Sequence, residues 1–324
     1  SSAASDVYKR QIFRYMKISK VIGLVFLCFL TFGLNAQNKI SEKKELEDSF
    51  NFIIATDLGR NGRYDQKPIA ELMGETAKAV DAEFIISSGD THHYIGVESL
   101  SDPLWMTNFE LIYSHPELQL EWYPLLGNHE YRGNTQAVID YSKISRRWCM
   151  PDRYYTQVYQ LKNGESLRIV YIDTPPLIDK YRNESDKYPD AVKQDMDKQL
   201  AWLDATLKAS TEKWKVVVGH HPIYAETPKD DSERADMQKR VGPILKKYNV
   251  DMYICGHLHT FQHLKMKDSK IDYVVNSSGS LSRSPKAIEG TVFCSGETGF
   301  SVFSATDKEI AVSYTHLRDH ETRG

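Results

Sequence analysis

The stretch "EFIISSGDTHHYIGV" at residues 83–97 decides the fold prediction, because its pattern recurs along the chain. A short apolar run ends at Gly89-Asp90, and two histidines, His92 and His93, follow it. A run of this length bounded by turn-forming residues is typical of a buried strand. The polar side chains after it indicate a binding site at the strand end. A polar loop that only caps the strand is the simpler alternative.

Four other segments repeat this arrangement of an apolar run followed by a polar side chain. They are "NFIIAT" before Asp57, "WYPLL" before Gly127-Asn128, "WKVVV" before Gly219-His220 and "DMYIC" before Gly256-His257. Amphipathic stretches at 67–80, 190–209 and 235–248 predict helices between the runs. Strands that alternate with helices predict an α/β fold with a largely parallel centre. The strand-rich segment from 271 to 314 predicts a second, more antiparallel sheet. We therefore expect a single domain with two mixed β-sheets sandwiched between helices.

The two ends of the chain carry other patterns. Met16 is followed by two lysines, an apolar run at 21–34 and the small residue Ala36, which together indicate a signal peptide over 16–36. A retained N-terminal anchor is the alternative. Residues 1–15 precede this start and residues 315–324 break off a strand-like pattern, so we expect a non-native leader and tail around a domain at 37–314. We expect an exported protein, periplasmic or extracellular, with no stable membrane association once the signal is cleaved.

The net charge and composition of the chain give information about its binding partners. The chain has 324 residues and a formal net charge of −3, which gives no electrostatic case for binding nucleic acid. A hydrophobic fraction of 41% is ordinary for a globular protein with a substantial core. The oligomeric state is not predicted from these values.

The polar residues after the five runs form an ordered set of motifs. They are D-x-G at 57–59, GD at 89–90, GNHE at 127–130, GHH at 219–221 and GHLH at 256–259. In open α/β sheets, ligands bind at the carboxyl ends of the strands, so five loops would deliver oxygen and nitrogen atoms to one edge. This mixed ligand set suits Fe, Zn or Mn, whereas Mg or Ca would favour oxygen alone.

With these motifs, the sequence resembles the calcineurin-like metallophosphoesterases, and within them the purple acid phosphatases of the tartrate-resistant type. The resemblance runs from about Phe52 to about Tyr314 and includes "AVIDYSKISRRWCMPDRYY" (137–155), "QLAWLDATL" and "CGHLHTFQHL". It implies the calcineurin-like phosphoesterase fold and a site for two transition-metal ions. It also implies hydrolysis of phosphate esters by attack of a metal-bound hydroxide.

The resemblance also implies a role for each ligand. Asp57 and His259 would bind the first metal, and Asp90 would bridge both metals and so take part in catalysis. Asn128, His220 and His257 would bind the second metal. His129 matches the position of the general acid that protonates the leaving alkoxide.

One ligand departs from the family pattern. Purple acid phosphatases carry Gly-Asp-x-x-Tyr, with the Tyr oxygen on the first metal, and this chain has His93 at that position. Imidazole binds the same metals, so we predict that His93 is the ligand, with Tyr94 as the alternative. His92 and His221 are predicted to contact the substrate.

The predicted function is therefore an exported dinuclear-metal phosphatase that hydrolyses phosphate monoesters, either small esters or phosphoprotein. A phosphodiesterase or nucleotide pyrophosphatase with the same metal core is one alternative. A metal-binding protein without catalysis is another. The substrate is not predicted, because the loops at 60–66 and 174–189 carry no recognisable motif.

Overall fold

The computed structural model describes residues 48–317. The predicted leader at 1–15, the signal peptide at 16–36 and residues 318–324 of the predicted tail lie outside the described residues. The predicted domain boundary at Tyr314 falls inside the last strand, which continues to His316.

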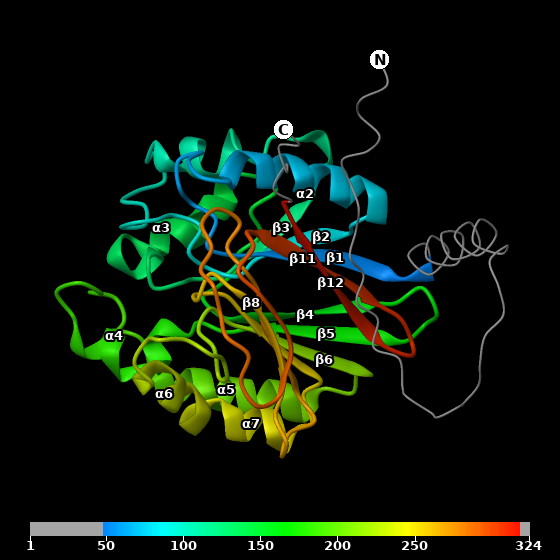
Figure 1. The fold of residues 1–324 in the computed structure, drawn as a ribbon. Helices are drawn as coiled ribbons and strands as arrows, with labels where there is room; N and C mark the ends of the chain where they lie inside the picture. The colour runs from blue at the N-terminus through cyan, green and yellow to red at the C-terminus, as the bar shows by residue number, and fades with distance from the viewer. Residues whose placement is uncertain (1–47, 318–324) are drawn as a thin grey trace, which may run out of the picture.

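Two β-sheets form the centre of the molecule (Figure 1). The first has five strands in the order β12-β11-β1-β2-β3, and the second has seven in the order β10-β8-β9-β7-β6-β5-β4. The strands are β1 (Phe50–Ala55), β2 (Phe84–Ser87), β3 (Glu121–Pro124), β4 (Tyr155–Gln160), β5 (Ser166–Tyr171), β6 (Trp214–Val218), β7 (Met252–Cys255), β8 (Phe261–Lys265), β9 (Asp272–Val275), β10 (Thr291–Ser295), β11 (Gly299–Ala305) and β12 (Ile310–His316). Strands β1, β2 and β3 pair in parallel, as do β5, β6, β7 and β9.

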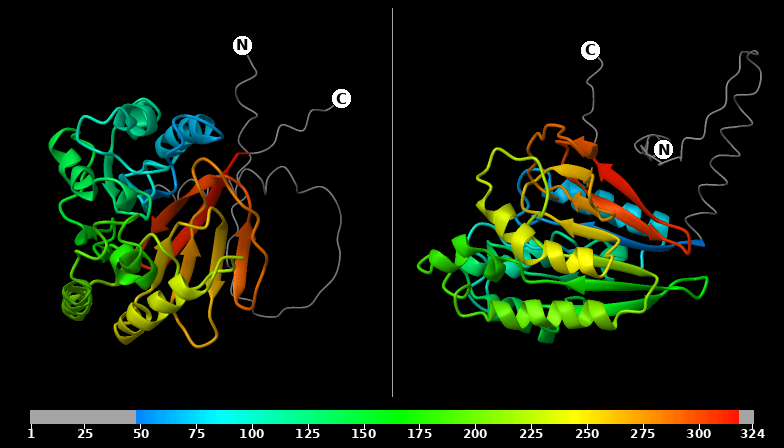
Figure 2. Two further views of the ribbon diagram at one scale, coloured as in Figure 1. Left: turned by 90° about the vertical axis from the view of Figure 1, so that its left-hand side faces the viewer. Right: turned by 90° about the horizontal axis from the view of Figure 1, so that it is seen from below.

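Helices cover both outer faces of this pair of sheets. Helix α2 (Gln66–Val80) lies over the five-stranded sheet, and α5 (Met196–Ala209), α6 (Ser232–Arg240) and α7 (Gly242–Lys247) lie under the seven-stranded sheet (Figures 1 and 2). The short helices α3 (Thr135–Asp140) and α4 (Asp179–Asn183) lie at one end of the sheets. The predicted α/β class and the two-sheet sandwich are therefore confirmed. Within residues 48–317, no helix combines the length and the apolar content needed to span a membrane.

Aromatic side chains join the inner faces of the two sheets. The Tyr159 ring, from the seven-stranded sheet, stacks on Phe84 of the five-stranded sheet with ring centroids 4.6 Å apart and lies 5.3 Å from Phe50. Tyr123 and Tyr171 make a second contact between the sheets at 6.2 Å. Large buried rings contribute much of the apolar area removed from water, so these contacts fix how the sheets face each other.

The arrangement of the C-terminal strands differs from the prediction. β11 and β12 extend the five-stranded sheet beside β1, whereas β8, β9 and β10 belong to the seven-stranded sheet, with β9 parallel to β7. The expectation that the strands of 271–314 all belong to the second, more antiparallel sheet is therefore wrong, because β11 and β12 join the other sheet. All seven residues of β11 are buried, and such a strand requires neighbours and cover on both faces.

Two predicted helices also have different bounds. The stretch at 190–209 becomes helical only at Met196, because the Asp195 side chain caps the helix by accepting a hydrogen bond from the Lys198 N–H at 2.9 Å. The stretch at 235–248 forms two helices, since Pro243 has no N–H to continue the first one and instead begins the second.

Phe52→Ala tests the packing of β1. Phe52 is fully buried, and its ring stacks on Phe84 at 5.1 Å and on Phe303 at 5.4 Å. The substitution should lower the free energy of unfolding by about 3–5 kcal/mol, the usual cost of removing a buried Phe side chain. Val158→Ala, at a position that is 44% exposed, is the control and should change it by less than about 0.5 kcal/mol in urea denaturation. Equal effects of the two variants would contradict the packing described here.

Candidate metal centre

The carboxyl ends of the parallel strands in both sheets meet at one edge of the molecule. Asp57 follows β1, Asp90 follows β2, Asn128 follows β3, His220 follows β6, and His257 and His259 follow β7. Each of these residues, like His93 in the loop after β2, is buried. The two sheets thus bring together all seven predicted metal ligands.

Asp57, His93 and His259 form the first group, with candidate ligand atoms within 4.8 Å of one another. The His259 Nδ1–H donates to the Leu281 carbonyl at 2.7 Å, which leaves Nε2 with its lone pair 3.0 Å from Asp57 Oδ1. His93 Nε2 lies 3.6 Å from Asp90 Oδ2. The Tyr94 side chain is 59% exposed, and Arg60 packs over its ring. The structure therefore places His93, and not Tyr94, within this first group.

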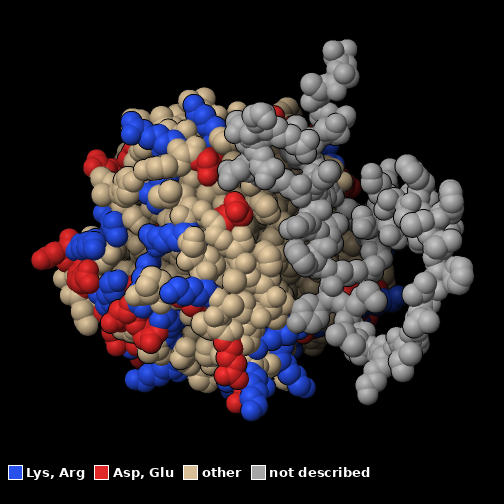
Figure 3. Space-filling view, viewed as in Figure 1, with Lys and Arg blue, Asp and Glu red and all other residues tan. Residues whose placement is uncertain are grey.

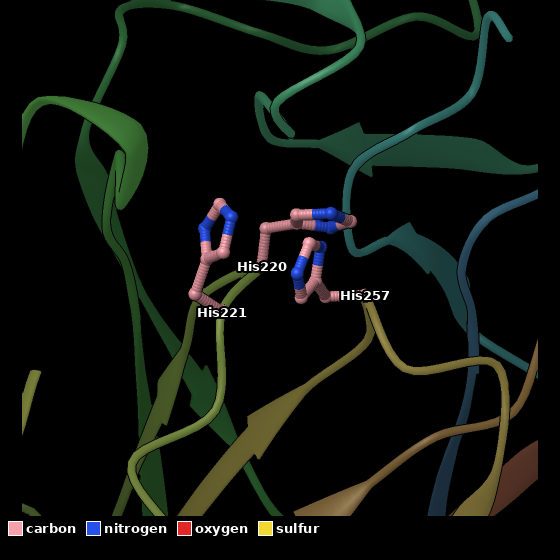
Figure 4. A group of neighbouring side chains, drawn as sticks. All are labelled: His220, His221 and His257. Carbon is pink, nitrogen blue, oxygen red and sulfur yellow. The ribbon is translucent and has the colours of Figure 1, made fainter. Parts of the chain in front are cut away.

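His220, His221 and His257 gather in a second group (Figure 4), and His220 also belongs to a cluster with Asp57 and Asp90. His220 donates Nδ1–H to the Ser88 carbonyl at 2.8 Å, and its Nε2 lies 3.1 Å from Asp90 Oδ2. Asp90 also belongs to the clusters that contain His93 and Asp57, so it occupies the bridging position between the two groups. The Asn128 side chain is 5% exposed, and its Oδ1 has no hydrogen-bond partner.

The donor atoms of both groups fit metal ions. On four of the predicted ligands, five buried atoms have no hydrogen-bond partner: Asp57 Oδ1, Asn128 Oδ1, His220 Nε2 and both ring nitrogens of His93. Buried polar atoms in folded proteins nearly always find partners, so a set of such atoms gathered at one point needs an additional one. Histidines whose other ring nitrogen is held by a carbonyl or carboxylate are the usual metal ligands. Cations bound by oxygen and nitrogen together would satisfy one such atom on each of these side chains.

The charges of the site also favour the binding of metal ions. Burial favours the neutral form of Asp90, but His220 and His129 beside it hold the pKa of its carboxyl well below the ordinary value. Burial opposes protonation of His220, yet the charges of Asp90 and Asp57 raise its pKa to about 9. The two carboxylates are therefore anionic and make the site attractive to positive charge.

The backbone of several ligands adopts an unusual conformation that directs their side chains to a common centre. Asp57, Asp90, His257 and His259 have φ angles of 52°, 54°, 70° and 60°, in the left-handed region that costs non-glycine residues of order 1–3 kcal/mol. A Cβ at Gly127 would collide with the Asp90 carboxylate, and one at Gly256 would collide with Thr56 and Asp57. Such strain persists where the surroundings fix it, as they do at functional sites.

A chain of hydrogen bonds orients His257. His257 Nε2 lies 2.9 Å from Glu233 Oε2, and Tyr181 donates its hydroxyl to Glu233 Oε1 at 2.9 Å. Although burial disfavours its charge, the hydrogen bond with His257 lowers the pKa of Glu233, so this carboxylate stays ionised and can only accept. With a proton on Nε2 facing Glu233, His257 keeps the Nδ1 lone pair for a metal, whereas Lys229 Nζ, 3.0 Å from the same Nε2, competes for that position. No sequence motif indicated a role for Glu233, which lies in α6, far along the chain from His257.

His221 and His92 are not among the residues that line the cavity, and their contact with the substrate stays a prediction. His221 is fully buried, with Nδ1 2.8 Å from the Thr174 hydroxyl and Nε2 2.8 Å from the Tyr181 hydroxyl. It extends the chain of hydrogen bonds that ends at Glu233. His92 is also fully buried and packs edge-on against Trp105 at 4.5 Å. Neither of its ring nitrogens has a hydrogen-bond partner.

Glu130 links two of the ligand loops from inside. Its carboxylate accepts hydrogen bonds from the backbone N–H groups of Asp90 at 2.9 Å, His92 at 3.0 Å and Gly127 at 2.8 Å. Burial and the charge of Asp90 raise its pKa to about 7.

His129 lies at the boundary between the metal ligands and an open cavity of about 700 Å³. Its Nδ1–H donates to the Tyr94 carbonyl at 2.6 Å, so Nε2 is the nitrogen that remains available, 3.8 Å from Asp90 Oδ2. Burial lowers the pKa of His129, and the Asp90 carboxylate opposes this shift. Residues from the loops at 60–66 and 174–189, for which no motif was recognised, contribute Arg60 and Lys180 to the cavity wall.

Comparison with known proteins agrees with this geometry. The sequence profile of the calcineurin-like phosphoesterase family matches residues 50–261. Purple acid phosphatase 3 of Arabidopsis thaliana is 32% identical over 277 residues, which cover 81% of this chain and 73% of that protein. Tartrate-resistant acid phosphatase type 5 of Oryctolagus cuniculus is 30% identical over 259 residues, 76% of this chain and 79% of that protein.

A solved structure confirms the fold independently. GAP50, described as the anchor in the inner membrane complex of Plasmodium, superposes with a TM-score of 0.72 at 21% identity, over 85% of this chain and 87% of that chain. The chain belongs to the calcineurin-like phosphoesterases, in their purple acid phosphatase branch. It is therefore a metal-dependent phosphoric ester hydrolase, from a family that uses a dinuclear metal centre.

Glu233→Gln tests how His257 is oriented. The variant removes the negative charge that holds the His257 proton on Nε2, so affinity for the second metal should fall by about 10–100-fold, the usual effect of losing such a partner. Calorimetric titration of the metal-free protein measures the two sites. Glu184→Gln, on the same cavity wall, is the control and should leave both affinities unchanged. Equal metal affinities in the Glu233 variant and the unaltered protein would contradict this role.

His93→Ala and Tyr94→Phe distinguish the two candidates for the remaining ligand of the first metal. Loss of the His93 imidazole should reduce metal occupancy of the first group, whereas loss of the exposed Tyr94 hydroxyl should leave it unchanged. A phenolate on Fe(III) gives a visible charge-transfer band, so the iron-loaded protein should show no strong band. A band that disappears in Tyr94→Phe would identify Tyr94 as the ligand instead. Elemental analysis and visible absorption measure both outcomes.

Proposed function

We propose that this protein is an exported phosphatase that hydrolyses phosphate monoesters with two transition-metal ions, drawn from Fe, Zn or Mn. The observation that carries the proposal is the position of His129. It presents one ring nitrogen to the cavity directly beside the buried Asp90 that both ligand groups share. A proton donor next to a bridging carboxylate is the arrangement that ester cleavage requires.

The residues divide the chemistry between them. Bound in these two groups, metal ions would supply positive charge for the phosphate and acidity for a water molecule. Asp57, His93 and His259 would hold the first ion, and Asn128, His220 and His257 the second, with Asp90 shared. His129 is oriented by its hydrogen bond to the Tyr94 carbonyl. When protonated, its Nε2 can donate to the leaving oxygen as the ester bond breaks.

The preference for monoesters and the export of the protein are supported by separate observations. Preference for monoesters is supported by the similarity to acid phosphatases over most of the chain. Export is supported by the basic residues, apolar run and small residue at 16–36. Fractionation of cells that express the chain with and without residues 16–36 tests export, and cytoplasmic retention of both forms would contradict it.

Steady-state hydrolysis of paired substrates tests the reaction. Zinc- or manganese-loaded protein should cleave p-nitrophenyl phosphate with a kcat/KM at least about tenfold above that for bis(p-nitrophenyl) phosphate, and strong chelator should abolish both activities. A preference for the diester would favour the phosphodiesterase alternative. Absence of turnover in protein that holds both metals would favour a non-catalytic metal-binding protein.

His129→Gln tests the general acid. The variant should keep both metals but lower kcat for an alkyl phosphate by about 10²–10⁴-fold, because the alkoxide then leaves without a proton. The loss should be much smaller with p-nitrophenyl phosphate, whose leaving group needs little protonation. His263→Gln, which removes a histidine outside the cavity, is the matched control and should retain full activity. An equal loss with both substrates would remove His129 from proton transfer.

A further inference from the structure

The wall of the cavity is basic beyond what the metal ligands require. Six cationic side chains line it: Arg60, Arg132, Lys180, Lys187, Lys229 and Arg283. Besides the ligand Asp90, the carboxylates on the wall are Glu184, Asp230 and Glu233. Figure 3 shows charged side chains gathered on the left of this view, at the end of the sheets where the loops of the site lie.

Two of the six cations are already neutralised by carboxylates. Lys180 Nζ lies 2.7 Å from Glu233 Oε1, and Lys187 Nζ lies 3.8 Å from Glu184 Oε2. Among residues 48–317, no ion pair to a carboxylate is found for the other four, namely Arg60, Arg132, Lys229 and Arg283. Most cationic side chains that line a binding cavity without a carboxylate partner pair with a negatively charged group of the ligand.

The two arginines after β1 and β3 are partly immobilised in this state. Arg60 is 7% exposed, its guanidinium packs over the Tyr94 ring at 4.9 Å, and its buried Nε has no partner. Arg132 donates to the Tyr94 carbonyl at 3.2 Å and to the Tyr188 hydroxyl at 3.3 Å, and its Nε is also buried without a partner. Buried donors of this kind are costly unless a ligand satisfies them.

The other two cationic residues lie next to the metal ligands after β7, Lys229 through its side chain and Arg283 through its backbone. Lys229 Nζ lies 3.0 Å from His257 Nε2, and the Arg283 backbone N–H donates to the His259 carbonyl at 2.7 Å. The four cations without a carboxylate partner therefore line the same cavity as His129 and ligands of both groups. If two bound metals neutralise a single phosphate, these cations remain available to a further anion.

We propose that the enzyme acts on phosphate esters that carry a second phosphate group, which Arg132, Lys229, Arg283 and Arg60 bind beside the dinuclear centre. The inference rests on the proposed function, because it names the substrate class of that same site. Guanidinium groups bind phosphate oxygens in pairs, and Lys229 adds a point charge, so a doubly charged phosphate fits this wall better than a neutral leaving group. A cavity of about 700 Å³ has room for a small bisphosphate.

Binding of two non-hydrolysable ligands tests the proposal. Zinc-loaded protein should bind propane-1,3-diphosphonate at least about tenfold more tightly than propylphosphonate, the gain expected from one added charge-assisted interaction. Arg132→Gln and Arg283→Gln alter side chains that contact no predicted metal ligand. Each should weaken diphosphonate binding by about tenfold while changing propylphosphonate binding less than about threefold. Arg146→Gln removes an exposed arginine away from the cavity and should change neither affinity.

The outcomes separate this inference from the proposed function. Equal affinity for the two ligands, or an equal loss of both in the arginine variants, would overturn it, since the cations would then serve the single phosphate. Hydrolysis of propyl phosphate and of propane-1,3-diol bisphosphate is measured on the same preparation. Cleavage of propyl phosphate without preference for the bisphosphate would leave the phosphatase standing and contradict the second phosphate. Preference in binding without cleavage of either ester would contradict the phosphatase alone.

Discussion

Two buried carboxylates, Asp57 and Asp90, set the constraint on which the rest of the site depends. Each is at most 1% exposed, and an ionised carboxylate in a protein interior is unstable unless positive charge and hydrogen bonds surround it. The surrounding structure is built to supply both. Backbone N–H groups of His257 and His129 donate to the two carboxylates at 2.9 and 2.8 Å, and histidines from the second sheet face the remaining oxygens.

This constraint explains why the site needs both sheets. β1 and β2 deliver the carboxylates, whereas β6 and β7 deliver His220, His257 and His259. The aromatic contacts between the inner faces hold the two sheets in one relation, so the strand ends meet at a fixed edge. The left-handed backbone of four ligands is then the local cost of pointing their side chains at a common centre.

Much of this arrangement could be predicted from the sequence, because the signals are local. An apolar run followed by Gly and a polar side chain identifies a strand end, and the carboxyl ends of parallel strands meet at one edge. It was harder to predict which of two neighbouring histidines faces the site. His92 and His93 are neighbours in the chain, yet one packs against Trp105 in the core and the other faces Asp57 and His259. Only contacts with residues distant in the chain decide which of the two histidines packs in the core and which faces the ligands.

Residues that support the ligands were missed for the same reason. Glu233 holds His257 across 24 residues, and Lys229 reaches the site from a loop without a motif. Neither follows a periodic pattern, so nothing in the adjoining sequence marks them. The cavity wall likewise combines side chains from seven separate segments of the chain, so its net charge cannot be inferred from any one of them.

The central claim is that buried carboxylates and histidines from two sheets together hold a pair of metal ions. Anomalous diffraction from crystals of the zinc-loaded protein tests it directly. Two strong peaks should appear, one among Asp57, His93 and His259 and the other among Asn128, His220 and His257, with Asp90 between them. A single peak, or two peaks outside these groups, would contradict the account.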